Sequence, residues 1–317
     1  MQAILDVSIP VFAIILTGFL AGRFKLLGQD STAALNGFVY FIALPALFVS
    51  STATSPVREV LDWSLFGVVI GGYVATAIPV AIIARMFFSK RIGEVTLHTG
   101  SSVFANNGYM GIPLALAAFG DGAMTAIVAS VIANIVLVLG VASALMEVDR
   151  TGATGPRMIV DAFRGLVRSP LLWAFAIGMV ISAAGLTIPS PALRFMEMLG
   201  SAASPCALFA MGLFLVGQAV HKGAGEVVWI SAIKLFVHPA ATWLIAQYLI
   251  DVNAVQEGVS VLMASLPTGG LIFVLAQRYG VYVQRATAVI LVSTIVSVVT
   301  VSYVLQYYVP IVRAYLG

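Results

Sequence analysis

Two short segments of this chain carry amide, glycine and proline residues inside otherwise apolar stretches. The first is Ser101–Leu114, SSVFANNGYMGIPL, and its candidate binding residues are Asn106, Asn107, Gly108 and Met110. Proline removes a backbone donor, glycine loosens the backbone and asparagine competes for local hydrogen bonds. We therefore expect an unwound segment at Asn106–Pro113 in place of a regular helix.

The second segment is Ser265–Gly270, SLPTGG, and its candidate binding residues are Pro267, Thr268, Gly269 and Gly270. We place its break at Leu266–Gly270. Each break exposes the amino end of a half-helix, whose free N–H groups can face a bound anion. The side chains of Asn106, Asn107 and Thr268 could add neutral donors.

The alternative interpretation is that these residues only kink or pack helices, as Gly and Pro often do in membranes. A single break would leave the two interpretations evenly matched. Two breaks in corresponding places favour a substrate site, because paired interruptions are the best sequence pointer to the site of a carrier. Such breaks must lie inside protein or beside a watery cavity.

Lys234 and His238 are accessory candidates, since they stand one helical turn apart and share a helix face. Ionisable groups inside an apolar run are functional candidates by default. We favour the structural interpretation, in which Lys234 extends to the cytoplasmic surface and His238 stays neutral beside Pro239.

Acidic residues avoid the middle of the apolar runs. Those nearest to the runs are Asp6, Asp62, Asp121, Asp251, Glu257 and, a turn inside its run, Glu197. A proton or sodium relay usually needs paired midspan carboxylates, so we expect no acidic dyad and no essential metal. Phosphate-loop, zinc-protease and nucleophile-elbow motifs are absent, and we expect neither a cofactor nor an enzyme.

The elements around these segments are apolar enough for a bilayer, with 61% hydrophobic and 9% charged residues. Glycines spaced by four, Gly18 with Gly22 and Gly67 with Gly71, predict close helix packing. Ten apolar runs of membrane-spanning length are recognised. They are 4–22, 33–53, 64–87, 97–119, 123–146, 170–186, 193–217, 227–250, 256–279 and 285–308.

Basic residues concentrate in the odd-numbered loops between these runs. They are Arg23, Lys25, Arg85, Lys90, Arg91, Arg150, Arg157, Arg164, Arg168, Lys222, Arg278 and Arg285. Positively charged loops stay in the cytoplasm, so both termini are expected outside. No basic patch of the kind that binds nucleic acid is present.

The most polar connection, residues 148–169, divides the chain into residues 1–147 and 170–317, each with five predicted spans. An odd number of spans per half requires opposite orientations, so we expect an inverted repeat. Weak internal similarity agrees, because Phe119-Gly120 and Tyr279-Gly280 end corresponding runs.

The two broken segments carry a family resemblance. Asn106–Leu114, ending in Met110–Leu114, resembles the fourth-span signature of the auxin efflux carrier family. Leu266–Gly270, followed by Phe273 and Ala276–Gly280, is similar to its ninth-span signature. Plant members usually have a longer central loop, and this chain resembles the short bacterial branch, which includes malonate and malate carriers. Ala105 departs from the plant pattern, which commonly has proline there.

The resemblance implies the fold of sodium/proton antiporters, with spans 1, 2, 6 and 7 as a scaffold and spans 3–5 and 8–10 as a moving transport domain. It also implies elevator-type alternating access, a homodimer and the bacterial inner membrane. We expect an all-α secondary transporter of small organic anions such as malonate, malate or auxin-like acids. A passive channel is the main alternative, and an intramembrane hydrolase based on His238 is a remote one.

Overall fold

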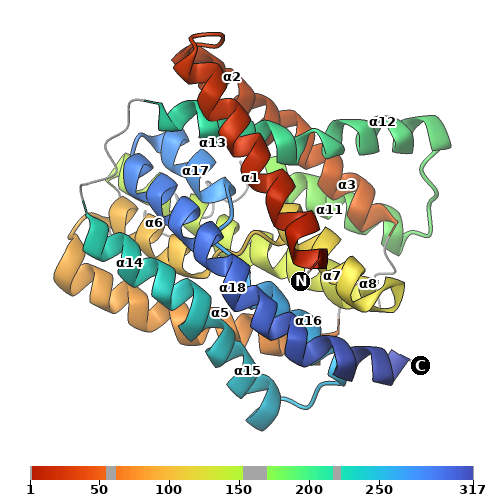
Figure 1. Cartoon of the computed structure of the whole chain (residues 1–317). Helices are drawn as coiled ribbons and strands as arrows, with labels where there is room; N and C mark the ends of the chain where they lie inside the picture. Colours follow the sequence, from red (N-terminus) through yellow and green to blue (C-terminus); the bar gives the residue numbers. More distant parts are fainter. Residues whose placement is uncertain (1, 55–61, 153–169, 217–222, 317) are drawn as a thin grey trace. The chain divides into compact units, whose positions relative to one another are not determined.

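The structure is a computed structural model that describes residues 2–54, 62–152, 170–216 and 223–316 (Figure 1). These residues are almost entirely helical and form no strand; a single bridge pairs Ala105 with Thr268. The all-α prediction is confirmed. Most of the predicted linker, residues 153–169, lies outside the described residues.

Helices occupy each of the predicted apolar runs. In the described part of the chain, six are long and apolar enough to cross a membrane: Asp30–Ala53, Trp63–Phe88, Ala129–Thr151, Ser190–Phe214, Ala224–Tyr248 and Val283–Leu316. Large apolar side chains such as Trp63 (82% exposed) and Tyr248 (75% exposed) point outward. Such surfaces suit a lipid environment, and the chain is a multi-pass membrane protein.

The chain divides into two compact units. Unit 2 is built from residues 6–60 and 167–219, and unit 1 from residues 61–166 and 220–317 with a short amino-terminal piece. The helices of unit 2 are α1 (Gln2–Arg23), α2 (Gln29–Phe38), the π-helix η1 (Val39–Ala43), α3 (Leu44–Ala53), α11 (Pro170–Ala183), α12 (Ser190–Ser201) and α13 (Ala203–Leu215).

Unit 2 is held together by glycines at helix contacts. A Cβ on Gly18 of α1 would lie 2.1 Å from the carbonyl oxygen of Phe209 in α13. A Cβ on Gly212 of α13 would lie 2.0 Å from the carbonyl oxygen of Ile15 in α1. In the same way Gly200 of α12 lies against the backbone of Leu47 in α3. The predicted close packing at Gly18 is confirmed, because only glycine lets these backbones approach so closely.

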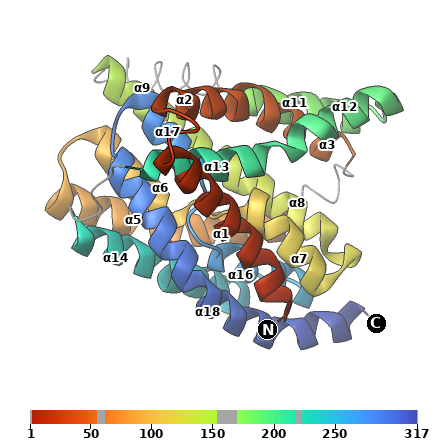
Figure 2. The same ribbon diagram turned by 45° about the horizontal axis from the view of Figure 1, so that its top comes forward.

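Unit 1 holds the two broken segments and the helices around them. Its first half contains α5 (Trp63–Ile83), η2 (Ala84–Phe88), α6 (Ile92–Val103), η3 (Asn107–Gly111), α7 (Ile112–Phe119), η4 (Asp121–Ala123), α8 (Met124–Ala133), η5 (Asn134–Leu139) and α9 (Gly140–Thr151). Its second half contains α14 (Ala224–Ala232), η6 (Ile233–Val237), α15 (His238–Tyr248), α16 (Ala254–Ser265), α17 (Leu271–Tyr279) and α18 (Val283–Leu316). Within the unit, α5 packs on α15 (Figure 1), and α18 packs on both α14 and α16 (Figure 2).

The second helix break lies at Leu266–Gly270, between α16 and α17, where the sequence predicts it. The first break is shifted. It lies at Phe104–Asn106, and the predicted unwound segment Asn106–Pro113 is mostly π-helix and α-helix. Pro113 does not interrupt the half-helix, because the π-helical turn η3 ends two residues before it and a local π-helical adjustment accommodates the backbone groups that a proline leaves unpaired.

The two broken spans of unit 1 are built alike. A helix of 12 residues, α6 or α16, leads into each break, and a shorter helix, α7 or α17, leads out. Glycines with positive φ end both shorter helices, 78° at Gly120 and 66° at Gly280. Glycine adopts this backbone conformation without the penalty that a Cβ would bring.

Candidate functional site

The two breaks cross each other inside unit 1 as short antiparallel segments. The bridge pairs Ala105 with Thr268. The N–H of Asn106 donates to the carbonyl of Pro267 at 2.9 Å, and the N–H of Gly269 donates to the carbonyl of Phe104 at 3.0 Å. Each break thus supplies hydrogen-bond partners that the other lost when its helix stopped, which is what backbone at membrane depth requires.

Thr268 anchors this crossing. Its hydroxyl donates to the carbonyl of Ser101 at 2.6 Å, and its N–H donates to the Ser293 hydroxyl at 3.1 Å. The residue is completely buried. Its hydroxyl proton is already used within the protein, so Thr268 contributes to the shape of the site and has no free donor for a ligand.

Asn134 was not anticipated as part of the site, yet it holds the other side of the crossing. Its amide nitrogen donates to the carbonyl of Ala105 at 2.8 Å, and its amide oxygen faces the Ala105 N–H at 3.4 Å. The Tyr73 hydroxyl donates to the same oxygen at 3.0 Å. A lone amide inside the apolar run 123–146 is the sequence signal that could have revealed it.

Asn106 and Asn107 lie at the start of the half-helix η3–α7. They are 5% and 1% exposed, and the amide oxygen of each lacks a hydrogen-bond partner among the described residues. The amide nitrogen of Asn107 donates weakly, at 3.4 Å, to the carbonyl of Ser130. Buried polar atoms normally have partners, so these two amides have unused hydrogen-bonding capacity at the crossing.

The glycines at the crossing fall into two classes. A Cβ on Gly269 would lie 2.7 Å from the Phe104 ring and 3.0 Å from the carbonyl oxygen of Ala105, so no larger residue fits. A Cβ on Gly108 or Gly270 would meet no atom within 4 Å. Open space therefore borders the amino ends of both half-helices.

The two half-helix starts have no capping side chain, neither at Asn106 before η3 nor at Gly270 before α17. Their first N–H groups carry the partial positive charge of a helix amino end. Among the other predicted residues, Pro267 contributes its carbonyl to the crossing, and Met110 is 2% exposed. The predicted residues thus come together on both sides of one crossing.

Lys234 does not extend to a surface, contrary to the interpretation we favoured. It is completely buried, and its ammonium donates to the carbonyl of Ala264 at 2.5 Å and approaches Nδ1 of His238 at 3.2 Å. Ala264 lies in the last turn of α16, where carbonyl groups lose their helical partners. The cation therefore compensates the negative end of the broken helix, close to the crossing.

His238 continues this contact toward the crossing. Its ring stacks on that of Tyr73 with centroids 5.1 Å apart, and Tyr73 bonds Asn134. Lys234 and the pairing at Ala105 are thus connected through buried side chains. The described residues contain no group of three or more His, Cys, Asp or Glu side chains that could hold a metal ion.

Comparison with known proteins agrees with this architecture. Residues 3–305 match the family model described as "Membrane transport protein". The chain is 30% identical to the Rhizobium meliloti protein named "Putative malonate transporter", over 95% of each chain. It is 27% identical to "Uncharacterized transporter YfdV" of Escherichia coli, over 92% of this chain and 93% of that protein. It is 21% identical to "Auxin efflux carrier component 8" of Arabidopsis thaliana, over 88% of this chain and 90% of that protein. The chain belongs to the auxin efflux carrier family of membrane transport proteins.

Proposed function

We propose that this protein is a secondary transporter of small organic anions, with its substrate site at the crossing of Phe104–Asn106 and Leu266–Gly270. The observation that carries the proposal is the pair of uncapped half-helix starts beside open space at Gly108 and Gly270. N–H groups at helix amino ends bind carboxylates and phosphates. A buried basic side chain, Lys234, bonds the carbonyl of Ala264 two residues before the second break, which also favours an anion.

The names of the relatives support carboxylates as the substrate class. One relative is named for malonate and another for auxin, and both substrates are carboxylic acids. Asn106 and Asn107 would donate to the carboxylate, while their spare amide oxygens would accept from water or a substrate hydroxyl. Malonate and indole-3-acetate are therefore suitable probes, a dianion and a monoanion.

The transport cycle we propose is an elevator. Unit 1, which holds the whole crossing, corresponds to spans 3–5 and 8–10 and would be the moving transport domain; unit 2 corresponds to spans 1, 2, 6 and 7 and would be the scaffold. The similar construction of the two broken spans supports ten spans in two inverted repeats. The proposal includes a homodimer in the bacterial inner membrane with both termini outside.

A carrier and a passive channel differ in one measurement. Vesicles preloaded with unlabelled malonate should take up labelled malonate by counterflow, with an initial rate that saturates and is competed by related acids. A channel would give conductance that does not saturate and no counterflow.

Asn106→Ala and Asn107→Ala test the site directly. We expect each to weaken malonate binding by about 10- to 100-fold, since a hydrogen bond to a charged group contributes about 1.5–3 kcal/mol. Binding to purified protein and counterflow in proteoliposomes give the result. Gln247→Ala, an exposed amide of unit 1 bonded to Glu257, is the matched control and should bind normally. Normal affinity in both asparagine variants, at matched thermal stability, would remove these side chains from the site.

Lys234→Met tests whether the buried cation contributes to anion selection. The screened interaction of a lysine with the substrate is on the order of 1–2 kcal/mol for each negative charge that the substrate carries. Malonate carries two such charges and indole-3-acetate carries one. We therefore expect a larger loss of affinity for malonate than for indole-3-acetate. Lys90→Met is the control, because that lysine also donates to a backbone carbonyl, of Arg85 at 2.9 Å, but is exposed. Equal losses for the two probes would argue against an electrostatic role.

A further inference from the structure

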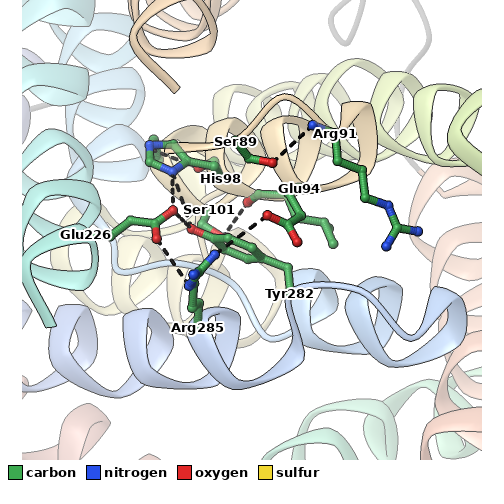
Figure 3. A network of polar contacts seen from close by, with 10 residues as sticks. Ser89, Arg91, Glu94, His98, Ser101, Glu226, Tyr282 and Arg285 are labelled. Atoms are coloured by element: carbon green, nitrogen blue, oxygen red, sulfur yellow. Dashed lines mark hydrogen bonds and ion pairs between the residues drawn. The ribbon is translucent and has the colours of Figure 1, made fainter. Parts of the chain in front are cut away.

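A second polar cluster of unit 1 includes two residues of α6, the helix whose carboxyl end leads into the crossing. We call it the His98 cluster, and it consists of Glu94, His98, Glu226, Tyr282 and Arg285 (Figure 3). Glu94 and His98 lie in α6, Glu226 lies in the first turn of α14 and Arg285 in the first turn of α18; Tyr282 directly precedes α18. The cluster was not predicted from the sequence, because His98 and Glu226 are 128 positions apart.

Glu226 is the centre of the His98 cluster. Its Oε1 lies 2.7 Å from Nδ1 of His98 and also accepts a hydrogen bond from the Tyr282 hydroxyl. Its Oε2 pairs with Nε of Arg285 at 3.2 Å, and Arg285 in turn lies 3.7 Å from Glu94. Figure 3 shows His98, Tyr282 and Arg285 converging on the Glu226 carboxylate.

The central pair is buried. His98 is 1% exposed and Glu226 is 7% exposed, and the Phe88 ring covers the imidazole at a centroid distance of 4.8 Å. Removing a carboxylate from water is costly, and a buried ion pair is weak as a source of stability. A buried titratable pair inside a transporter is therefore a functional candidate.

The hydrogen bonds identify the atom that can accept a proton. The Glu226 carboxylate only accepts, so Nδ1 of His98 must carry the hydrogen between them. In the neutral imidazole this leaves Nε2 without a proton. Nε2 is buried and has no hydrogen-bond partner among the described residues. An incoming proton would bind there while the bond to Glu226 stays in place.

Charge counting favours the same event. With neutral His98 the cluster contains two carboxylates, Glu94 and Glu226, and one guanidinium, Arg285. Tyr282 does not change this count, because burial and the adjacent Glu226 carboxylate raise the pKa of its hydroxyl and keep it protonated. A single proton on His98 makes the cluster neutral.

Helix α6 connects the His98 cluster to the crossing. The carbonyl of His98 accepts a bond from the Ser102 hydroxyl at 3.0 Å, and the carbonyl of Ser101 accepts the bond from Thr268. The next residues of α6 lead to Phe104, whose carbonyl pairs with Gly269. Proton binding at His98, midway along α6, and anion binding at the carboxyl end of α6 would thus act on one short helix.

We propose that His98 and Glu226 form a proton-binding site that couples transport of the organic anion to symport of a proton. The inference rests on the proposed carrier function. A bound anion attracts a proton within the same compact unit, so each ligand raises the affinity for the other. Because each ligand favours binding of the other, the carrier crosses the membrane either with both ligands or with neither. Transport of this kind is symport.

The experiment uses the full chain in proteoliposomes with the membrane potential clamped by valinomycin and equal potassium. An inward malonate gradient at equal pH should acidify the lumen, reported by internal pyranine. A pH gradient, acid outside, should drive accumulation of labelled malonate by up to about tenfold per pH unit for one proton per anion. Protein-free liposomes correct for diffusion of the free acid.

Glu226→Gln should lose both the acidification and the gradient-driven accumulation but keep counterflow, because one carboxylate and one guanidinium remain and the cluster is neutral without a proton. His98→Gln keeps the negative charge of the unprotonated cluster, so it should lose the coupling and also slow counterflow. Arg91→Gln is the matched control. It removes an exposed guanidinium that pairs with Asp149 at 2.9 Å beside the start of α6, and it should leave the protein fully coupled. Two variants are used so that a folding failure of one leaves the other decisive.

The outcomes separate the two proposals. Absence of counterflow in the unmodified protein would overturn the carrier function itself. Counterflow without malonate-driven acidification would leave the carrier and overturn proton symport. Coupling that persists in either glutamine variant would overturn the assignment to His98 and Glu226, and acidification in the unmodified protein supports symport even if both variants fail to fold.

Discussion

Replacing Gly269 by alanine is expected to reduce transport at least tenfold, although the change adds a single methyl group. That methyl would lie 2.7 Å from the Phe104 ring and 3.0 Å from the carbonyl oxygen of Ala105. The ring can shift, but the carbonyl belongs to the pairing between the two breaks. Overpacking of this kind costs about 1–3 kcal/mol, and here the strain falls on the hydrogen bonds that hold both half-helix starts in place.

Gly270→Ala is the matched control for this prediction. Gly270 has helical dihedrals, φ −58° and ψ −21°, and its Cβ would meet no atom within 4 Å. We expect normal folding, and at most a reduced affinity for a substrate that fills that space. Initial rates of malonate counterflow and thermal unfolding of both variants give the comparison. Equal activity of Gly269→Ala and the unmodified protein would show that the close approach at the crossing is not needed.

The location of the breaks was largely predictable because their causes are local. Proline, glycine and asparagine act on the backbone within a few residues, and Leu266–Gly270 was placed correctly. The first break was misplaced by a few residues, because Pro113 was read as an interruption, although the π-helical turn η3 before it lets the half-helix continue. Sequence alone does not distinguish these two uses of proline.

The residues that hold the breaks together were not predictable in the same way. Asn134 and Ser293 bond the crossing from helices that lie far along the chain, and each looks like an isolated polar residue in an apolar run. His98 and Glu226 were not recognised as a pair, because they are distant in the sequence and the expected signal was a pair of midspan carboxylates, not a histidine with a carboxylate. Contacts of this range depend on how helices pack, which a hydropathy pattern does not record.

Lys234 illustrates a related limit. Long basic side chains near helix ends commonly reach the membrane surface, and that general tendency led to the wrong expectation. The structure buries the ammonium because a carbonyl of the interrupted helix α16 is available as its partner. The break that makes the site also creates the acceptor for the cation, so the two features are linked only once the fold is known.

Asn134→Leu is expected to have the second large effect, lowering the free energy of unfolding by about 2–4 kcal/mol. The substitution keeps the volume similar but removes the donor to the Ala105 carbonyl and the acceptor facing the Ala105 N–H. Each buried backbone group left without a partner costs about 1–3 kcal/mol. Because Ala105 is the paired residue of the first break, malonate binding should fall together with stability.

Tyr73→Phe separates the two contacts of the Asn134 amide, one with the Tyr73 hydroxyl and the other with the backbone of Ala105. It removes only the outer hydrogen bond, 3.0 Å from the tyrosine hydroxyl to the Asn134 oxygen, and leaves both bonds to Ala105 intact. We expect a loss of about 1 kcal/mol and nearly normal binding. Thermal unfolding in detergent and malonate titration measure both quantities. If Tyr73→Phe were as damaging as Asn134→Leu, the important interaction would be the contact of Tyr73 with His238 and Lys234, and Asn134 would no longer be the residue that secures the crossing.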